Sequence, residues 1–210
     1  MRHIAAALAA LLAVAVAVPA VAHAPSVVDA AQGTPDVALV LEDPTLSRAI
    51  GSTIASPGEV DWFRMDLRSG EPLVVGMTAP DAVGAIAASF ILAGPGLPAP
   101  DPADPELGIF ADVAGAEGAI RFQPVAEPPL ENHAGLGFIN YGTIRMEAPA
   151  DGSYYVAVFA LDPAATGKYV FAPGVREEFG VDAFGGYFAL QSFFSAPWPD
   201  PALAEGSTAG

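Results

Sequence analysis

Apolar and polar residues alternate in several short stretches of this chain, and such alternation predicts half-buried β-strands. The clearest stretch covers residues 58–76, where Phe63, Met65 and Leu67 are separated by charged residues. Further strands are expected at 37–41, 49–55, 85–98, 120–125, 137–148, 153–161 and 167–174. Short strands separated by turns rich in glycine (22) and proline (21) are typical of a sandwich or barrel, not of an α/β fold.

A hairpin is predicted in the clearest stretch. Residues 68–70 can form a three-residue loop whose last position, a glycine, requires left-handed backbone geometry. This loop would pair Met65 with Leu73 and Phe63 with Val75, which keeps the apolar residues of both strands on one face.

The segments between and after the strands carry other patterns. Residues 99–108 are rich in proline and acid, so we expect a surface loop, and no helix of ordinary length is expected between residues 37 and 172. The aromatic segment 176–200 is either a C-terminal helix or strand that closes the core or an exposed element that docks to a partner. Its aromatic residues are Phe179, Phe184, Tyr187, Phe188, Phe193, Phe194 and Trp198, and helical spacing relates Phe184, Tyr187, Phe188 and Gln191.

The N-terminal residues have the pattern of an export signal. Arg2 is followed by the apolar run 4–18, and Ala22-His23-Ala24 supplies the small-x-small pattern of a cleavage site. The alternative is a retained membrane anchor, although the run is shorter than the roughly 20 residues of a spanning helix. We therefore expect an exported protein, periplasmic or secreted, with no integral membrane segment after signal removal.

Composition excludes some classes of function. The chain has 24 acidic and 8 basic residues and a formal net charge of −16, so nucleic acid is not an expected partner. It has no cysteine, and therefore neither disulfides nor a thiolate site. His133 would be the only histidine after signal removal, which excludes a zinc site with two histidine ligands. The Gly-x-Ser-x-Gly pattern of a nucleophile elbow is not present.

Two segments resemble the bacterial pre-peptidase C-terminal domain family. The first runs from residue 58 to 80 and the second from residue 148 to 174, so the resemblance covers roughly residues 36–174. The matching residues are Glu59, Asp61, Trp62, Phe63 and Gly70 in the first segment and Gly152, Tyr154, Tyr155, Val156, Gly167 and Tyr169 in the second. The chain departs from the family pattern because no hydrolase is attached and because residues 80–140 carry a long proline-rich insertion.

The resemblance implies a small antiparallel, jelly-roll-like β-sandwich on a secreted bacterial protein. Members of this family are appended to peptidases and other hydrolases and are not themselves catalytic. Some members bind calcium, extracellular matrix or carbohydrate.

Two groups of acidic residues are candidate calcium ligands, because calcium takes six to eight oxygen ligands from loop carboxylates. The alternative is that they are solvated loop acids, and the acids before the strand could instead accept hydrogen bonds from loop amides. The candidates are Glu59 and Asp61 beside the tryptophan, and Asp101, Asp104 and Glu106 in the acid-proline loop.

Aromatic residues on the outer face of the strands are candidate ligand-binding residues. Trp62 points away from Phe63, so it is either exposed, where it could stack on a sugar, or covered by a neighbouring loop. Tyr154 and Tyr155 point to opposite sides of their strand, and Tyr155 is the candidate for binding.

The sequence therefore predicts an all-β, antiparallel, jelly-roll-like sandwich with a short aromatic C-terminal segment. The expected divisions are a signal peptide (1–24), a flexible lead-in (25–36), the sandwich (37–174), the aromatic extension (175–198) and a disordered tail (199–210). The expected function is that of a non-catalytic binding or accessory module at the cell envelope, with a protein or polysaccharide partner and no required cofactor. The alternatives are a carbohydrate- or calcium-binding domain, a carboxylate-dependent hydrolase, and a subunit that docks through its aromatic C-terminus.

Overall fold

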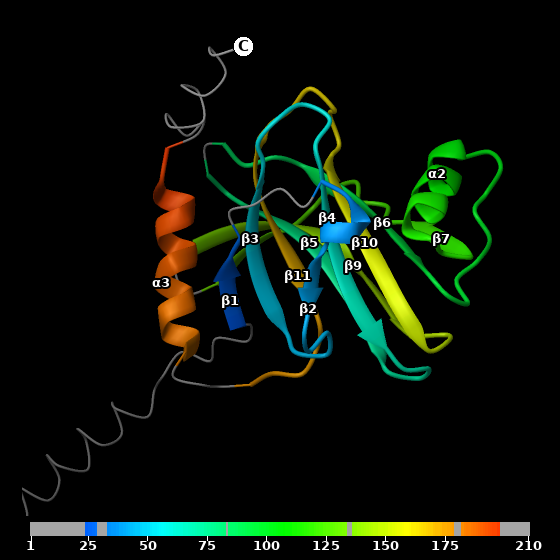
Figure 1. The fold of residues 1–210 in the computed structure, drawn as a ribbon. Coiled ribbons are helices and arrows are strands. Elements are labelled where there is room, and N and C mark those ends of the chain that lie inside the picture. Colours follow the sequence, from blue (N-terminus) through cyan, green and yellow to red (C-terminus); the bar gives the residue numbers. More distant parts are fainter. Residues whose placement is uncertain (1–23, 29–32, 83, 134–135, 179–181, 198–210) are drawn as a thin grey trace, which may run out of the picture.

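Two β-sheets face each other in the computed structural model, which describes residues 24–28, 33–82, 84–133, 136–178 and 182–197 (Figure 1). The six-stranded sheet and the five-stranded sheet form a sandwich, which confirms the predicted fold class. The order in the first sheet is β1 (Ala24–Val27), β3 (Arg48–Ile54), β11 (Gly167–Pro173), β5 (Pro72–Pro80), β9 (Leu136–Glu147) and β8 (Leu130–His133). The order in the second sheet is β2 (Leu39–Leu41), β4 (Val60–Leu67), β10 (Gly152–Ala160), β6 (Ala88–Gly94) and β7 (Gly118–Arg121).

Most neighbouring strands are antiparallel, and the two exceptions lie at sheet edges. The edge strand β1 runs parallel to β3, and the edge strand β2 runs parallel to β4. Strand β1 and the 3₁₀ turn Pro35–Val37 occupy part of the segment for which the sequence predicts a flexible lead-in. Those parts of the lead-in therefore have regular structure.

The core lies between the two sheets and is built from the inward-pointing residues of their strands. Phe63 on β4 and Phe171 on β11 come from opposite sheets, and their ring centroids are 4.4 Å apart. Tyr154, Tyr169 and Phe90 are also completely buried. Burial of these large rings, together with the aliphatic residues of the same core, stabilises the sandwich.

The predicted hairpin between β4 and β5 is wrong. The two strands lie in different sheets: β4 pairs with β10, so that Met65 lies opposite Tyr154, and β5 pairs with β9, so that Leu73 lies opposite Met146. The apolar residues of both strands nevertheless belong to one core. Alternation therefore identified the buried face of each strand correctly but did not identify its neighbour.

The turn after β4 carries the chain from one sheet to the other. Gly70 has φ +85°, the left-handed geometry predicted for it. The Gly70 N–H donates to the carbonyl of Ala148 (2.9 Å), and the Ser69 N–H donates to the carboxylate of Asp151 (2.7 Å). The turn is also closed by the bond from the Glu71 N–H to the Arg68 carbonyl (3.0 Å), but the strands on either side of it pair with β10 and β9 and not with each other.

Helix α2 (Pro105–Ala114) lies where the sequence predicts a surface loop and no helix. Pro105 occupies the first turn and Gly115 ends the helix in the left-handed conformation (φ +63°), which are the usual start and stop residues of a helix. Leu107 and Ala111 are buried against Ile91 and Ala93 of β6, so α2 covers the outer face of the second sheet. The helix is short and its proline- and acid-rich start resembles a loop in composition, which explains the wrong prediction.

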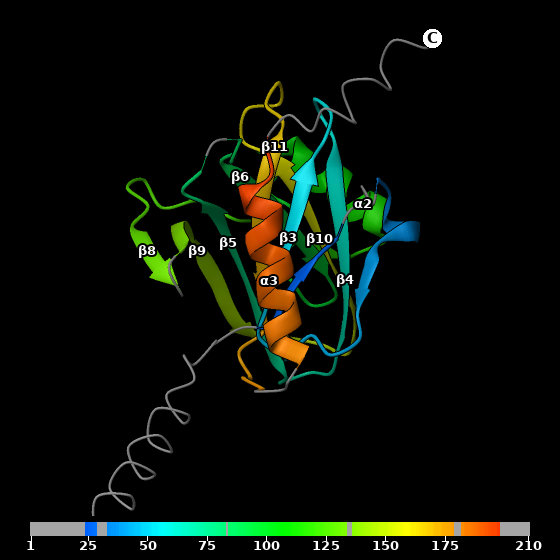
Figure 2. The ribbon, with the colours of Figure 1, turned by 90° about the vertical axis from the view of Figure 1, so that its left-hand side faces the viewer.

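Helix α3 (Asp182–Ser195) covers the outer face of the first sheet, and Figure 2 shows it in front of β3 and β1. Leu190 and Phe194 are buried against Val170 and Phe138, whereas Phe188 is 62% exposed. The C-terminal segment is therefore a helix that packs on its own sandwich. Phe179, Trp198 and the side chain of Phe184 lie outside the described residues.

Close approach of α3 to the sheet depends on small residues and on one buried cation. A Cβ at Gly51 of β3 would meet the side chains of Leu190 (2.7 Å) and Phe193. Lys168 on β11 is 4% exposed, and its Nζ donates to the carbonyls of Phe193 (2.5 Å) and Ala196 (2.7 Å). A lysine there donates hydrogen bonds to carbonyls at the C-terminus of α3. Its positive charge also interacts favourably with the negative end of the helix dipole.

Among the described residues, no helix is long and apolar enough to cross a membrane. Residues 1–23 of the predicted export signal and the predicted tail, 199–210, lie outside the described residues, so the predictions for them stay predictions. Ala24, the last residue of the predicted signal, is the first residue of β1.

Replacement of two phenylalanines on α3 tests the docking of this helix. We expect Phe194→Ala to lower the free energy of unfolding by about 3 kcal/mol, because it leaves a cavity against Phe138 and Val170. The matched change Phe188→Ala, on the exposed side, should change it by less than about 0.5 kcal/mol. Urea unfolding followed by tryptophan fluorescence measures both values. Equal effects of the two variants would contradict the packing of α3 on the sheet.

Candidate functional site

Glu59, a candidate calcium ligand, organises the turn before β4. Its Oε2 accepts hydrogen bonds from the N–H of Ser56 (2.8 Å), the N–H of Ala55 (3.1 Å) and the hydroxyl of Ser56 (2.9 Å). These bonds are the capping role that the sequence offers as an alternative to calcium binding. Glu59 therefore has a structural role at the entry to the strand.

Asp61, the second candidate beside Trp62, points into the sandwich. It is 1% exposed, and its Oδ2 accepts hydrogen bonds from the hydroxyls of Tyr169 (2.5 Å) and Ser52 (3.1 Å). Burial, together with the negative charge of Asp61, raises the pKa of the Tyr169 hydroxyl well above its ordinary value. The carboxylate thus links β4 to β11 and β3 at the core.

Trp62 lies on the outer face of the second sheet, beneath α2. It is 3% exposed, and its ring centroid is 5.6 Å from that of Phe110 on α2. Phe110 also stacks on Phe159 of β10, with centroids 6.0 Å apart. A neighbouring segment therefore covers Trp62, which was the alternative to an exposed ligand-binding ring.

The acids of the acid-proline loop hold the start of α2 in place. Asp101 accepts a hydrogen bond from the N–H of Ala103 (2.8 Å). Asp104 and Glu106 both pair with the guanidinium of Arg121 on β7, at 2.7 Å and 2.5 Å. The hydrogen bond from Arg121 is the main reason that the pKa of Asp104 is lowered.

The structure does not bring the five calcium candidates to one centre. Asp104 and Glu106 share a guanidinium, while Glu59 and Asp61 have separate partners at the start of β4. Over the part of the chain that the structure describes, no three carboxylates or histidines are placed to share a metal ion. His133 is in the edge strand β8, and its side chain lies outside the described residues.

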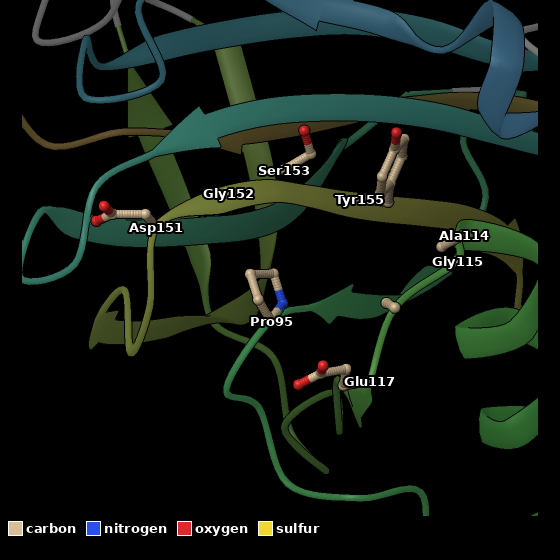
Figure 3. A pocket seen from close by; sticks show the side chains of 9 residues that line it. Pro95, Ala114, Gly115, Glu117, Asp151, Gly152, Ser153 and Tyr155 are labelled. Atoms are coloured by element: carbon tan, nitrogen blue, oxygen red, sulfur yellow. The ribbon is translucent and has the colours of Figure 1, made fainter.

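Tyr155 lies in a cleft of about 370 Å³ on the outer face of the second sheet (Figure 3). Tyr154 points into the core and Tyr155 points outward, so the two lie on opposite sides of the strand, as predicted. Tyr155 is half-buried and lies opposite Ala93 of β6, which leaves space beside its ring. The cleft is lined by Pro95, Ala114, Gly115, Ala116, Glu117, Asp151, Gly152, Ser153 and Tyr155.

Three segments far apart in the sequence form this cleft. Strand β10 and the preceding turn supply one wall, the residues after β6 supply Pro95, and the end of α2 supplies the remainder. Figure 3 shows Tyr155 on β10, Asp151 at the turn that precedes this strand, and Glu117 on the loop that follows α2. The sequence predicted Tyr155 but neither Glu117 nor Asp151, because no local pattern relates the two acids.

Tyr154 fixes the walls of the cleft from inside the core. Its hydroxyl is within hydrogen-bond distance of the carbonyls of Ala150 (2.8 Å) and Pro95 (3.0 Å), and it accepts from the N–H of Ala150 (3.2 Å). The same loop is held by the hydrogen bond from Ser69 to Asp151. The position of Asp151 and Pro95 is therefore set before any ligand arrives.

A polar network adjoins the cleft on the same face of the sheet. The hydroxyl of Ser153 donates to Asp66 (2.6 Å), and Asp66 accepts two further hydrogen bonds from Arg64 (3.0 and 2.9 Å). The bond from Ser153 is the main reason that the pKa of Asp66 is lowered. Arg64, which lies opposite Tyr155 in the strand register, is thus paired with a carboxylate.

Comparison with known proteins gives little information on this site. No family model matches the chain, and no curated protein matches it. Among solved structures, the chain is similar to CorA, a surface-associated copper-binding protein important in copper acquisition by Methylomicrobium album BG8, with a TM-score of 0.37 and 13% identity. The match covers 71% of this chain and 100% of the other. At this TM-score the similarity assigns no site and no ligand.

The buried pair of Tyr169 and Asp61 predicts a dependence of stability on alkaline pH. The pKa of Tyr169 is higher in the folded chain than its ordinary value of 10.0, so the unfolded chain loses this proton first as the pH rises. The stability contributed by Tyr169 should be complete below about pH 10 and should decrease above it. Urea unfolding at about pH 9 and about pH 11 should therefore show a smaller loss of stability in Tyr169→Phe than in the wild type. An identical loss in both proteins would contradict the buried phenol–carboxylate pair.

Proposed function

We propose that this chain is an exported, non-catalytic β-sandwich that acts as a binding or accessory module at the bacterial cell envelope, with the cleft beside Tyr155 as its binding site. The observation that carries the proposal is the cleft itself, which holds a half-buried aromatic ring, includes Glu117 and Asp151 in its lining, and has walls held by core hydrogen bonds. Concave sites with a few fixed polar groups and an aromatic ring are the usual form of small binding sites.

The arrangement of the other candidate residues supports a binding role rather than catalysis. Glu59, Asp61, Asp104 and Glu106 have structural partners, which leaves them poorly placed for work on a substrate. The resemblance to the pre-peptidase C-terminal domain family supports the same role, and the N-terminal pattern supports export.

A carbohydrate-binding domain is the second candidate function, and Tyr155 is the observation that favours it. A tyrosine ring on an outer sheet face can stack on a sugar ring, and carboxylates can accept hydrogen bonds from sugar hydroxyls. A carboxylate-dependent hydrolase would instead use Glu117 and Asp151 as an acid and base pair across the cleft.

Removal of the Tyr155 ring tests the proposed binding site. We expect immobilised protein to capture a defined ligand from envelope extract, identified by mass spectrometry, and we expect Tyr155→Ala to lose at least 90% of that capture, by analogy with the loss of a central aromatic contact. Phe188→Ala is the control, because it removes an exposed ring from α3 on the other side of the sandwich. Equal capture by both variants would contradict the assignment of the cleft. Turnover of a polysaccharide or peptide panel that is lost in Glu117→Gln would contradict the non-catalytic role.

The calcium alternative has a separate test. We expect calorimetric titration with Ca²⁺ to show no saturable binding at millimolar concentration, and thermal unfolding to be the same with Ca²⁺ and with EDTA, because Asp104 and Glu106 already pair with Arg121. A midpoint that rises with Ca²⁺ and falls with EDTA would establish a calcium site. Glu59→Gln and Glu106→Gln would then show which group of acids provides it.

A further inference from the structure

The charged residues that line the cleft are all acidic. Glu117 and Asp151 contribute carboxylates, and no lysine or arginine is among the described lining residues. The nearest cation in the strand register is Arg64, opposite Tyr155, and its guanidinium donates to Asp66. A cationic ligand would therefore meet Glu117, and Asp151 whose carboxylate also accepts the hydrogen bond from Ser69, without a competing positive side chain in the lining.

The end of helix α2 adds negative potential to the same wall. Ala114 and Gly115, the last helical residue and the cap, both line the cleft. The C-terminus of a helix carries about half a negative charge, and a basic side chain in the last turn often compensates it. The N–H groups of Gly115 and Ala116 donate to the carbonyls of Asp112 (3.1 Å) and Ala111 (2.8 Å), which caps part of this terminus. The last turn of α2 holds no basic residue, so no cationic side chain of the helix itself offsets the remaining negative potential.

The ring and the size of the cleft indicate the shape of the cation. The face of a tyrosine ring attracts a cation that lies within about 6 Å of its centre. Pro95 and the Tyr155 ring are apolar surfaces on which an alkyl stem can pack, while the charged head reaches the carboxylates. A volume of about 370 Å³ accommodates one long side chain with its water.

We propose that the cleft binds a lysine or arginine side chain from a basic segment of a partner protein. This inference rests on the proposed function and names the class of ligand for the same site. The net charge of −16 would raise the local concentration of such a segment, whereas Tyr155, Glu117 and the α2 terminus would select one side chain from it. Free polyamines carry the same ammonium chemistry, so they are a separate arm of the test.

Nuclear magnetic resonance titration of the protein tests the proposal. The probes are a blocked glycine–arginine peptide, its lysine and glutamine counterparts, and spermidine, and the readout is the shift of the amide signals of Gly115, Glu117 and Gly152. We expect the arginine and lysine peptides to shift these signals and the glutamine peptide to leave them unchanged. Affinity for the basic peptides should fall about three- to fivefold in Glu117→Gln, as for a partly exposed ion pair. It should stay within twofold in Glu127→Gln, which removes an exposed acid outside the cleft lining.

Several results would overturn the inference. Equal shifts with the glutamine peptide would show that the charge is not recognised. Equal losses in Glu117→Gln and Glu127→Gln would show diffuse attraction by the net charge. Shifts with spermidine but with neither basic peptide would remove the protein partner. If envelope capture depends on Tyr155 while both basic peptides leave the cleft signals unmoved, the proposed function stands and the assignment of a basic side chain fails.

Discussion

The packing of one apolar sheet face against the other is the interaction on which the rest of this structure depends. Phe63 on β4 and Phe171 on β11 meet across the sandwich, with centroids 4.4 Å apart, and the apolar residues of β5 join the same core. This requirement explains why β4 and β5 are not a hairpin. Two consecutive strands whose apolar residues all face one core can lie opposite each other just as well as side by side, and the turn at Gly70 makes the crossing. The hydrogen bonds from this turn to Ala148 and Asp151 then fix the loop that borders the cleft.

The two outer faces of the sandwich are covered to different extents, and the difference creates the candidate site. Helix α3 lies on the first sheet, where Gly51 permits close contact and the buried Lys168 satisfies carbonyls at the helix end. Helix α2 lies on the second sheet over Trp62 and Phe159, and Arg121 holds its first turn. Because α2 ends at Ala114, it covers Trp62 but stops beside Tyr155. The boundary of one short helix thus decides which aromatic ring can meet a ligand.

The strands could be predicted from the sequence, but their partners could not. Strands β3, β9, β10 and β11 begin and end within one residue of the predicted ranges, because alternation and flanking glycines act locally. Pairing depends on contacts between distant segments, such as Met65 with Tyr154, which no local pattern specifies. The edge strands β1 and β8 are short and carry little alternation, so they were not predicted. Helix α2 carries the signals Pro105 and Gly115, but its acidic, proline-rich start has the composition of a loop.

The roles of the acidic residues also depend on contacts between distant segments and not on local sequence. From the sequence, Glu59, Asp61 and Asp104 looked alike, as carboxylates in or near loops that could face a cation. In the folded chain Glu59 binds loop amides, Asp61 binds the Tyr169 hydroxyl in the core, and Asp104 binds Arg121. A buried carboxylate is tolerated only when such partners replace its water, so the geometry of each partner decides its role.

The few cations of the chain show where its negative charge is left without compensation. Arg64 pairs with Asp66, Arg121 pairs with Asp104 and Glu106, and Arg176 pairs with Asp43. Each of these arginines holds a strand or loop through its ion pair and partly neutralises the negative charge there. No arginine or lysine is among the described residues that line the cleft with Glu117, Asp151 and the end of α2. In a chain with a net charge of −16, general acidity cannot mark a site. A carboxylate without an arginine partner, in a cleft that also holds an aromatic ring, can mark a site. The negative charge attracts many cations, and the shape of the cleft then selects among them.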